Sequence, residues 1–128
     1  MFCRICFLII TAICSLGLHA EVEYDIVPLL PADYVPSRGK VFQTIPKDMS
    51  RTGYVVGIWE EFEDYFSDPV RGGFVYHQNL GYQNIEIPGA VDVYPEKVNV
   101  HGVVAGTCYT TEDCFFIYDS ASQTVSYL

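Results

Sequence analysis

The feature that most constrains the fold is a set of short segments that recur in the same order along the chain. Three sets of segments match: 53–57 with 102–106, 73–76 with 115–118, and 42–45 with 82–85 and 122–125. Each segment contains β-branched or aromatic residues and is bounded by Gly, Pro or Asn, which is typical of a β-strand. Because the matches keep one order, they favour a tandem repeat of a small β unit.

The order of these segments predicts three-stranded antiparallel meanders in a β-repeat domain at 41–128. The expected parts are units at about 41–80 and 81–121 and a final strand at 122–127. We therefore predict an all-β fold, with propeller-blade-like meander repeats that form a small sheet, a sandwich or a partial barrel. Residues 21–40 precede this domain as an N-terminal strand, in which apolar and acidic residues alternate, and a Pro-rich loop.

The two-residue period of strands allows a hairpin register to be worked out from two cysteines. If Cys108 faces Cys114 across a turn, further pairs must lie on the same face. These pairs are Gly106 with Phe116 and Val104 with Tyr118. The same register in the first unit pairs Gly57 with Phe74 and Trp59 with Gly72. An aromatic ring that covers a glycine across the ladder fills the space left by the missing side chain.

The first twenty residues predict a secretory signal peptide. One basic residue, Arg4, precedes an apolar run at 5–14, and the stretch ends at the small residue Ala20. The run is shorter than the roughly 20 apolar residues that span a bilayer, so we expect no stable membrane span after cleavage. We predict cleavage near Ala20, which makes the protein secreted or periplasmic.

The mature chain is strongly acidic. Seven Lys and Arg residues stand against sixteen Asp and Glu residues, for a formal net charge of −9, and only Arg4 leaves with the signal. Such a surface repels nucleic acids and anionic lipids, so we expect no nucleic-acid partner. Solubility in the extracellular medium explains the charge better than an acidic recognition surface, because charged faces are usually just solvated.

Cysteine usage predicts one disulfide. Of the five cysteines three lie in the signal, which leaves Cys108 and Cys114 in the mature chain. An even number of thiols in an exported protein favours a disulfide over a redox or metal role. Two thiols with only His77 and His101 would not easily complete a tetrahedral zinc site.

Three segments together resemble a known family. At 98–106 (VNVHGVVAG), 73–76 (GFVY) and 85–90 (IEIPGA) the chain resembles the HAF-type extracellular repeat proteins, which are bacterial exported proteins built from tandem β units. Their pattern joins an Ile-Asn-x-x-Gly-x-Val-x-Gly strand, a Gly-Phe-Leu-Tyr-like strand and a Thr-Ile-Asp-x-Pro-Gly-Ala-like strand. The resemblance covers about 41–128, although 49–52 (MSRT) lacks the Ile-Asn of the pattern. It implies an exported, propeller-like β repeat and brings no catalytic residues.

Recognised catalytic motifs are missing from the sequence, which contains no Gly-x-Ser-x-Gly, His-Glu-x-x-His, phosphate-loop or EF-hand pattern. His77 and His101 are expected at strand ends as structural histidines rather than general bases. The adjacent carboxylates Glu60 and Glu61 would point to opposite faces of a strand, which suits glycoside hydrolysis badly. We therefore predict a protein that is not an enzyme.

The longer turn of the first unit, at 60–71, is the candidate ligand loop, because extra length on a turn is where binding groups usually accumulate. Its candidate residues are Glu60, Glu61, Phe62, Glu63, Asp64, Tyr65, Phe66 and Asp68. The carboxylates could bind Ca²⁺ and the rings could stack on a sugar. A solvated loop without a cofactor is the favoured reading, since the carboxylates follow no recognised metal spacing.

These observations lead to three hypotheses about function. The first is a non-catalytic exported β-repeat protein with a binding or structural role. The second is a calcium- or glycan-binding module that uses 60–71, and the third is a hydrolase with an unrecognised site. The strands at 22–27 and 122–127 would form open sheet edges, which predicts either pairing of the C-terminal strand, within the sheet or with a second molecule, or self-association.

Overall fold

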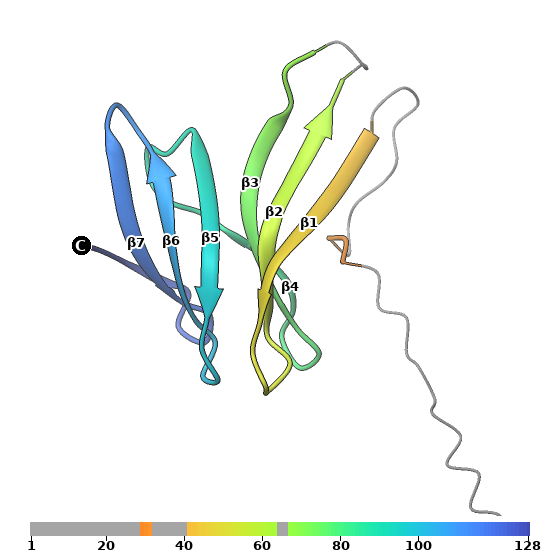
Figure 1. Ribbon diagram of the computed structural model, residues 1–128, viewed down its shortest axis with the longest axis vertical. Helices are drawn as coiled ribbons and strands as arrows, with labels where there is room; N and C mark the ends of the chain where they lie inside the picture. Colours follow the sequence, from red (N-terminus) through yellow and green to blue (C-terminus); the bar gives the residue numbers. More distant parts are fainter. Residues whose placement is uncertain (1–28, 32–40, 64–66) are drawn as a thin grey trace, which may run out of the picture.

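The protein is all-β, as predicted. The computed structural model describes residues 29–31, 41–63 and 67–128, and within them the chain forms two four-stranded antiparallel sheets (Figure 1). The predicted signal peptide at 1–20 and the predicted strand at 22–27 fall outside the described residues. Within the described part of the chain, helices of a length and apolarity suited to crossing a membrane do not occur.

Each sheet is a simple meander in which every strand pairs with its neighbours in sequence. The strands of the first sheet are β1 (Val41–Met49), β2 (Val55–Phe62), β3 (Val70–His77) and β4 (Gly81–Ile85). Those of the second sheet are β5 (Asp92–Val98), β6 (Val103–Tyr109), β7 (Asp113–Asp119) and β8 (Thr124–Tyr127). The C-terminal strand pairs with β7, so the prediction that it would be paired is confirmed.

Each meander has four strands rather than the three expected, so the boundary between the two units lies farther along the chain. β4 closes the first sheet, which therefore ends at Ile85, and the final strand at 122–127 becomes the fourth strand of the second sheet. The missed strand is β5, whose sequence DVYPEKV contains a proline and three charged residues. Such a sequence weakens the strand signal because proline cannot donate a ladder hydrogen bond.

The glutamine-containing segments at 42–45, 82–85 and 122–125 are not equivalent in the structure. The first lies in β1, which opens the first sheet, whereas the second lies in β4, which closes it. The third spans the turn before β8 and the start of that strand. The spacing of 40 residues between the first two segments is therefore coincidental, because β1 and β4 lie at opposite edges of one sheet and have different partners.

The predicted register is correct in both sheets. Gly57 pairs with Phe74 and Trp59 with Gly72 in the first sheet. The second sheet pairs Gly106 with Phe116, Val104 with Tyr118, and Cys108 with Cys114. A Cβ atom on Gly106 would lie 2.8 Å from the ring of Phe116, so the ring packs directly on the glycine. Both Phe74 and Phe116 are fully buried.

The turn that joins the first two strands of each sheet is built in the same way. Asn99 Oδ1 accepts hydrogen bonds from the backbone N–H groups of His101 at 2.9 Å and Val103 at 3.0 Å. Ser50 Oγ accepts the corresponding bond from the N–H of Tyr54 at 3.1 Å. A glycine with positive φ completes each turn, at Gly53 (91°) and Gly102 (78°). Serine thus performs in the first sheet the role of the asparagine in the second.

The core lies between the two sheets, where β5 packs across β1, β2 and β3 (Figure 1). The sheets approach closely at Gly73, where a Cβ atom would lie 2.7 Å from Pro95 Cγ. The core side chains are Val56, Val75, Ile85, Ile87, Val93, Val98, Val104, Cys108, Phe116 and Tyr118. Removing such side chains from water is worth about 25 cal/mol per Å² of apolar surface, which makes this face the main source of stability.

Polar contacts fix how the sheets are positioned. β1 and β5 each contain a register shift, between Pro46 and Asp48 and between Pro95 and Lys97. The carboxylate of Asp48 accepts a hydrogen bond from the N–H of Val98 at 3.1 Å, and this bond is the main reason that the pKa of Asp48 is lowered. A backbone donor just beyond the bulge of β5 is therefore satisfied by a side chain of the first sheet.

Candidate functional site

Glu60, the first residue of the predicted ligand loop, has a structural role. It lies in β2 with 8% of its surface exposed, and its carboxylate accepts hydrogen bonds from Arg71 Nε at 2.7 Å and from the Gln43 side-chain amide. The bond from Arg71 is the main reason that the pKa of Glu60 is lowered. Glu61 follows on the opposite face of the strand. The carboxylate of Glu60 is thus occupied by neighbours in its own sheet.

The rest of the predicted loop is only partly described. Phe62 ends β2 and is half-buried, whereas Glu63 and Asp68 are exposed. Outside the described residues lie Asp64, Tyr65 and Phe66. In the described ranges, 60–63 and 67–71 included, His, Cys, Asp and Glu side chains form no group of three or more that could hold a metal ion.

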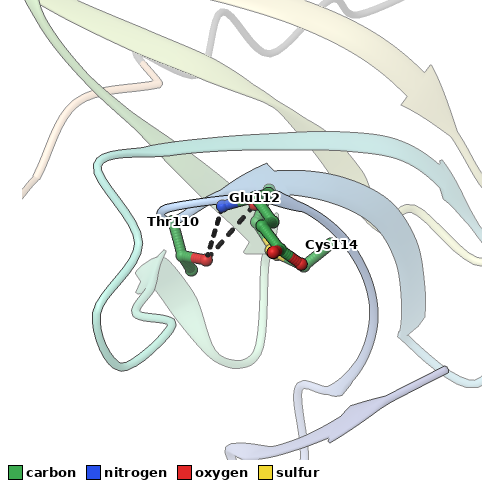
Figure 2. Close-up of a disulfide and its surroundings, with 4 residues drawn as sticks. Thr110, Glu112 and Cys114 are labelled. Carbon is green, nitrogen blue, oxygen red and sulfur yellow. Dashed lines mark hydrogen bonds between the residues drawn. A yellow bond between two sulfur atoms is a disulfide. The ribbon is translucent and has the colours of Figure 1, made fainter.

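The predicted disulfide is present. Cys108 in β6 is joined to Cys114 in β7 with their Cα atoms 4.9 Å apart, across a turn at 110–112 (Figure 2). In this turn the N–H of Thr110 donates to the carbonyl oxygen of Glu112 at 3.0 Å. In the first sheet the equivalent cross-strand place is taken by Trp59, whose indole lies against Gly72. The same cross-strand position is therefore occupied by a disulfide in the second sheet and by an aromatic ring packed on a glycine in the first sheet.

His77 is a satisfied structural residue, as predicted. It ends β3, is 9% exposed, and stacks on Tyr54 with the ring centroids 4.2 Å apart. Its Nδ1 accepts a hydrogen bond from the N–H of Asn79 at 3.2 Å, which leaves Nε2 to donate to the carbonyl oxygen of Thr52 at 3.1 Å. Both ring nitrogens are thus in use by the neutral side chain. His101 lies exposed in the turn between β5 and β6.

A cleft lies along β4, between the two sheets, and has a volume of about 670 Å³. One side is formed by residues of β4 and the segment that follows it: Tyr82, Gln83, Asn84, Glu86, Ile87 and Pro88. The other side is formed by Tyr118 of β7 and Gln123 of the turn before β8. A smaller hollow of about 210 Å³ shares Asn84, Glu86 and Ile87 with the cleft and is also lined by Trp59, Arg71 and Gly72. We call the two hollows together the β4 groove.

The β4 groove collects polar atoms that lack partners. Within the described residues, four buried side-chain nitrogen or oxygen atoms make no hydrogen bond: Trp59 Nε1, Tyr82 Oη, Gln83 Oε1 and Ser120 Oγ. The first three belong to residues that line the groove. A buried polar group without a partner costs about 1–3 kcal/mol, so native proteins usually keep such groups for a reason.

The larger cleft is electrostatically negative. Glu86 is exposed at its rim, and the described residues that line it include neither Lys nor Arg. Burial raises the pKa of Tyr118, and the nearby carboxylates of Asp119 and Glu86 raise it further, so the phenol stays protonated. Arg71 lines the smaller hollow, but its Nε is engaged by Glu60. The cleft therefore offers acceptors and a carboxylate, which suit a ligand that carries donors or positive charge.

Sequence reasoning did not find the β4 groove, because the groove depends on 82–85 closing the first sheet. One signal was present in the sequence, since Gly81–Ile85 (GYQNI) contains neither charge nor proline. Comparison of the chain with family models, with curated proteins and with solved structures finds no match.

Proposed function

We propose that the chain is an exported, non-catalytic β-repeat protein that acts by binding a ligand in the β4 groove. Export is supported by the signal-like sequence at 1–20 and by the disulfide, because disulfides persist in oxidising compartments outside the cytosol. The resemblance to HAF-type extracellular repeats points to the same compartment. The two similar meanders support a repeat origin.

The observation that carries the binding role is the gathering of unpartnered polar atoms along one groove. Gln83 Oε1 and Trp59 Nε1 are buried without a partner and belong to residues that line the groove, so a ligand bound there would bring hydrogen-bonding groups close to them. Binding sites usually combine a hollow with a few polar groups that fix orientation, and the β4 groove has both. The segment at 60–71 has less support, because Glu60 is held by Arg71 and Gln43.

The proposal is tested by locating a ligand on the mature protein, residues 21–128. A glycan array and a library of linear peptides are screened in parallel, and each binder is mapped by hydrogen exchange. We expect protection of the backbone at 81–88. Binders that protect only 60–71, or a protein that binds nothing in either screen, would show that the groove is not the functional site.

A charge substitution provides the matched control. Glu86 and Glu112 are both exposed, but only Glu86 lines the cleft. Glu86→Lys is therefore expected to alter the affinity of a groove ligand, whereas Glu112→Lys, which makes the same change of charge in the β6–β7 turn, is not. Equal effects of the two substitutions would indicate a general response to net charge and contradict binding in the groove.

A further inference from the structure

The four edge strands of the two sheets are protected unequally. β1 and β5 each contain a proline, a register shift and charged residues, which are the devices that keep an open edge from pairing with another chain. β4 and β8 are also edge strands, but their sequences, GYQNI and TVSY, contain neither proline nor charge, and their ladders are regular. The edges at the end of each meander are thus left open to pairing.

The β4 groove follows such an open edge. The cleft is lined by three consecutive residues, Tyr82, Gln83 and Asn84, although neighbouring side chains on a strand point to opposite faces. This lining fits a hollow that runs beside the strand, along the edge that does not face β3. The smaller hollow extends toward Arg71 and Gly72 of β3, which lie beyond the stretch of β3 paired with β4.

An open strand edge presents a row of backbone N–H and C=O groups at the spacing of another strand. From this geometry we propose that the β4 groove binds an extended peptide of a partner protein, which adds to β4 as a further strand. This inference rests on the proposed function and names its ligand. The backbone of the peptide supplies the alternating donors and acceptors, and its side chains reach Gln83 and Glu86.

The chemistry of the groove selects the peptide. The cleft has a carboxylate at its rim and no cationic side chain among its described lining residues, on a protein of formal net charge −9. A Lys or Arg side chain near Glu86 therefore complements it. Sugar rings usually bind on free aromatic faces, and the two tyrosines of the cleft offer at most one such face, on Tyr82. Tyr82 stacks on Phe74 at 5.1 Å between centroids, and Tyr118 is buried in the core.

The decisive experiment uses backbone N-methylation, which removes a single N–H group from a peptide without changing its side chains. Peptides of about ten residues, long enough to span a typical strand, are selected from an unbiased linear library on the mature protein. Each is then resynthesised with one N-methyl group at successive positions. Strand addition predicts losses of about tenfold or more at alternate positions and small changes between them, because only every second N–H faces β4.

The outcomes separate this inference from the proposed function. Enrichment of basic peptides with an alternating methylation pattern and protection at 81–88, weakened by Glu86→Lys but not by Glu112→Lys, supports strand addition. Peptides that tolerate methylation at every position, or a library that enriches nothing, overturn it. A glycan that protects 81–88 in the absence of any peptide binder would also overturn it, while leaving the proposed binding role of the groove intact.

Discussion

Removing the disulfide should destabilise the protein by an amount set by the short loop that it closes. The bridge joins cysteines six residues apart in sequence. In the chain-entropy model a loop of this length restricts the unfolded chain by roughly 7 cal/mol/K, which is about 2 kcal/mol at 25 °C. Because 1 kcal/mol shifts the melting temperature of a domain this small by about 4–8 °C, the Cys108→Ala, Cys114→Ala double variant should melt about 8–16 °C lower.

Calorimetry and urea unfolding of residues 21–128, the chain without the predicted signal peptide, measure this change. Reduction provides an internal control, since a thiol reductant should lower the stability of the wild type toward that of the double variant and leave the variant unchanged. A variant as stable as the oxidised wild type would refute the reasoning. So would a reductant that destabilises the variant, because its effect would then have a source other than the Cys108–Cys114 bond.

Three further predictions concern single contacts. Glu60→Gln should cost about 1–2 kcal/mol at pH 7, because it weakens an ion pair that is only partly exposed. Folding lowers the pKa of Glu60, so the contribution of its ionised carboxylate to stability is complete above the usual pKa of 4.5 and is lost as pH falls through the lowered pKa. The free energies of unfolding in urea of the wild type and the variant should therefore converge in acid. Asn99→Ala should cost about 1–2 kcal/mol in the same assay because two turn N–H groups lose their acceptor, and Ser50→Ala, which removes one such bond, should cost less. Deleting 122–128 should lower the melting temperature markedly or cause aggregation, because β7 loses one of its two neighbouring strands and becomes an exposed edge; a soluble truncated protein with an unchanged melting temperature would contradict this.

The hairpin registers could be predicted from the sequence because local rules determine them. Once Cys108 faces Cys114, the two-residue period of the strands places Gly106 under Phe116, and the matching segment carries the same register to Gly57 and Phe74. The turns also have a local signature, since an asparagine or serine three residues before a glycine supplies the side-chain acceptor. These features depend on residues that are near one another in sequence.

The number of strands and the position of the groove could not be predicted in this way. β5 is stabilised as a strand by packing across the first sheet, with Pro95 against Gly73, and this long-range contact outweighs its weak strand propensity. Without β5, the segment at 82–85 was assigned to the second unit. The segment can be placed at the open edge of the first sheet, beside the groove, only when β5 is recognised as a strand. The sequence of β5 gives too weak a strand signal for that.

The meander topology also bears on how the protein folds. Every strand pairs with a sequence neighbour, and the backbone passes from the first ladder to the second through the segment at 86–91. Hairpins can therefore form by closing short loops, which places the chain toward the fast end of the range for all-β proteins. The step that requires contact between distant residues is the docking of β5 onto β1, β2 and β3. Backbone cleavage within 86–91 would leave both ladders intact, so two separate fragments could reassemble through the core that joins the sheets.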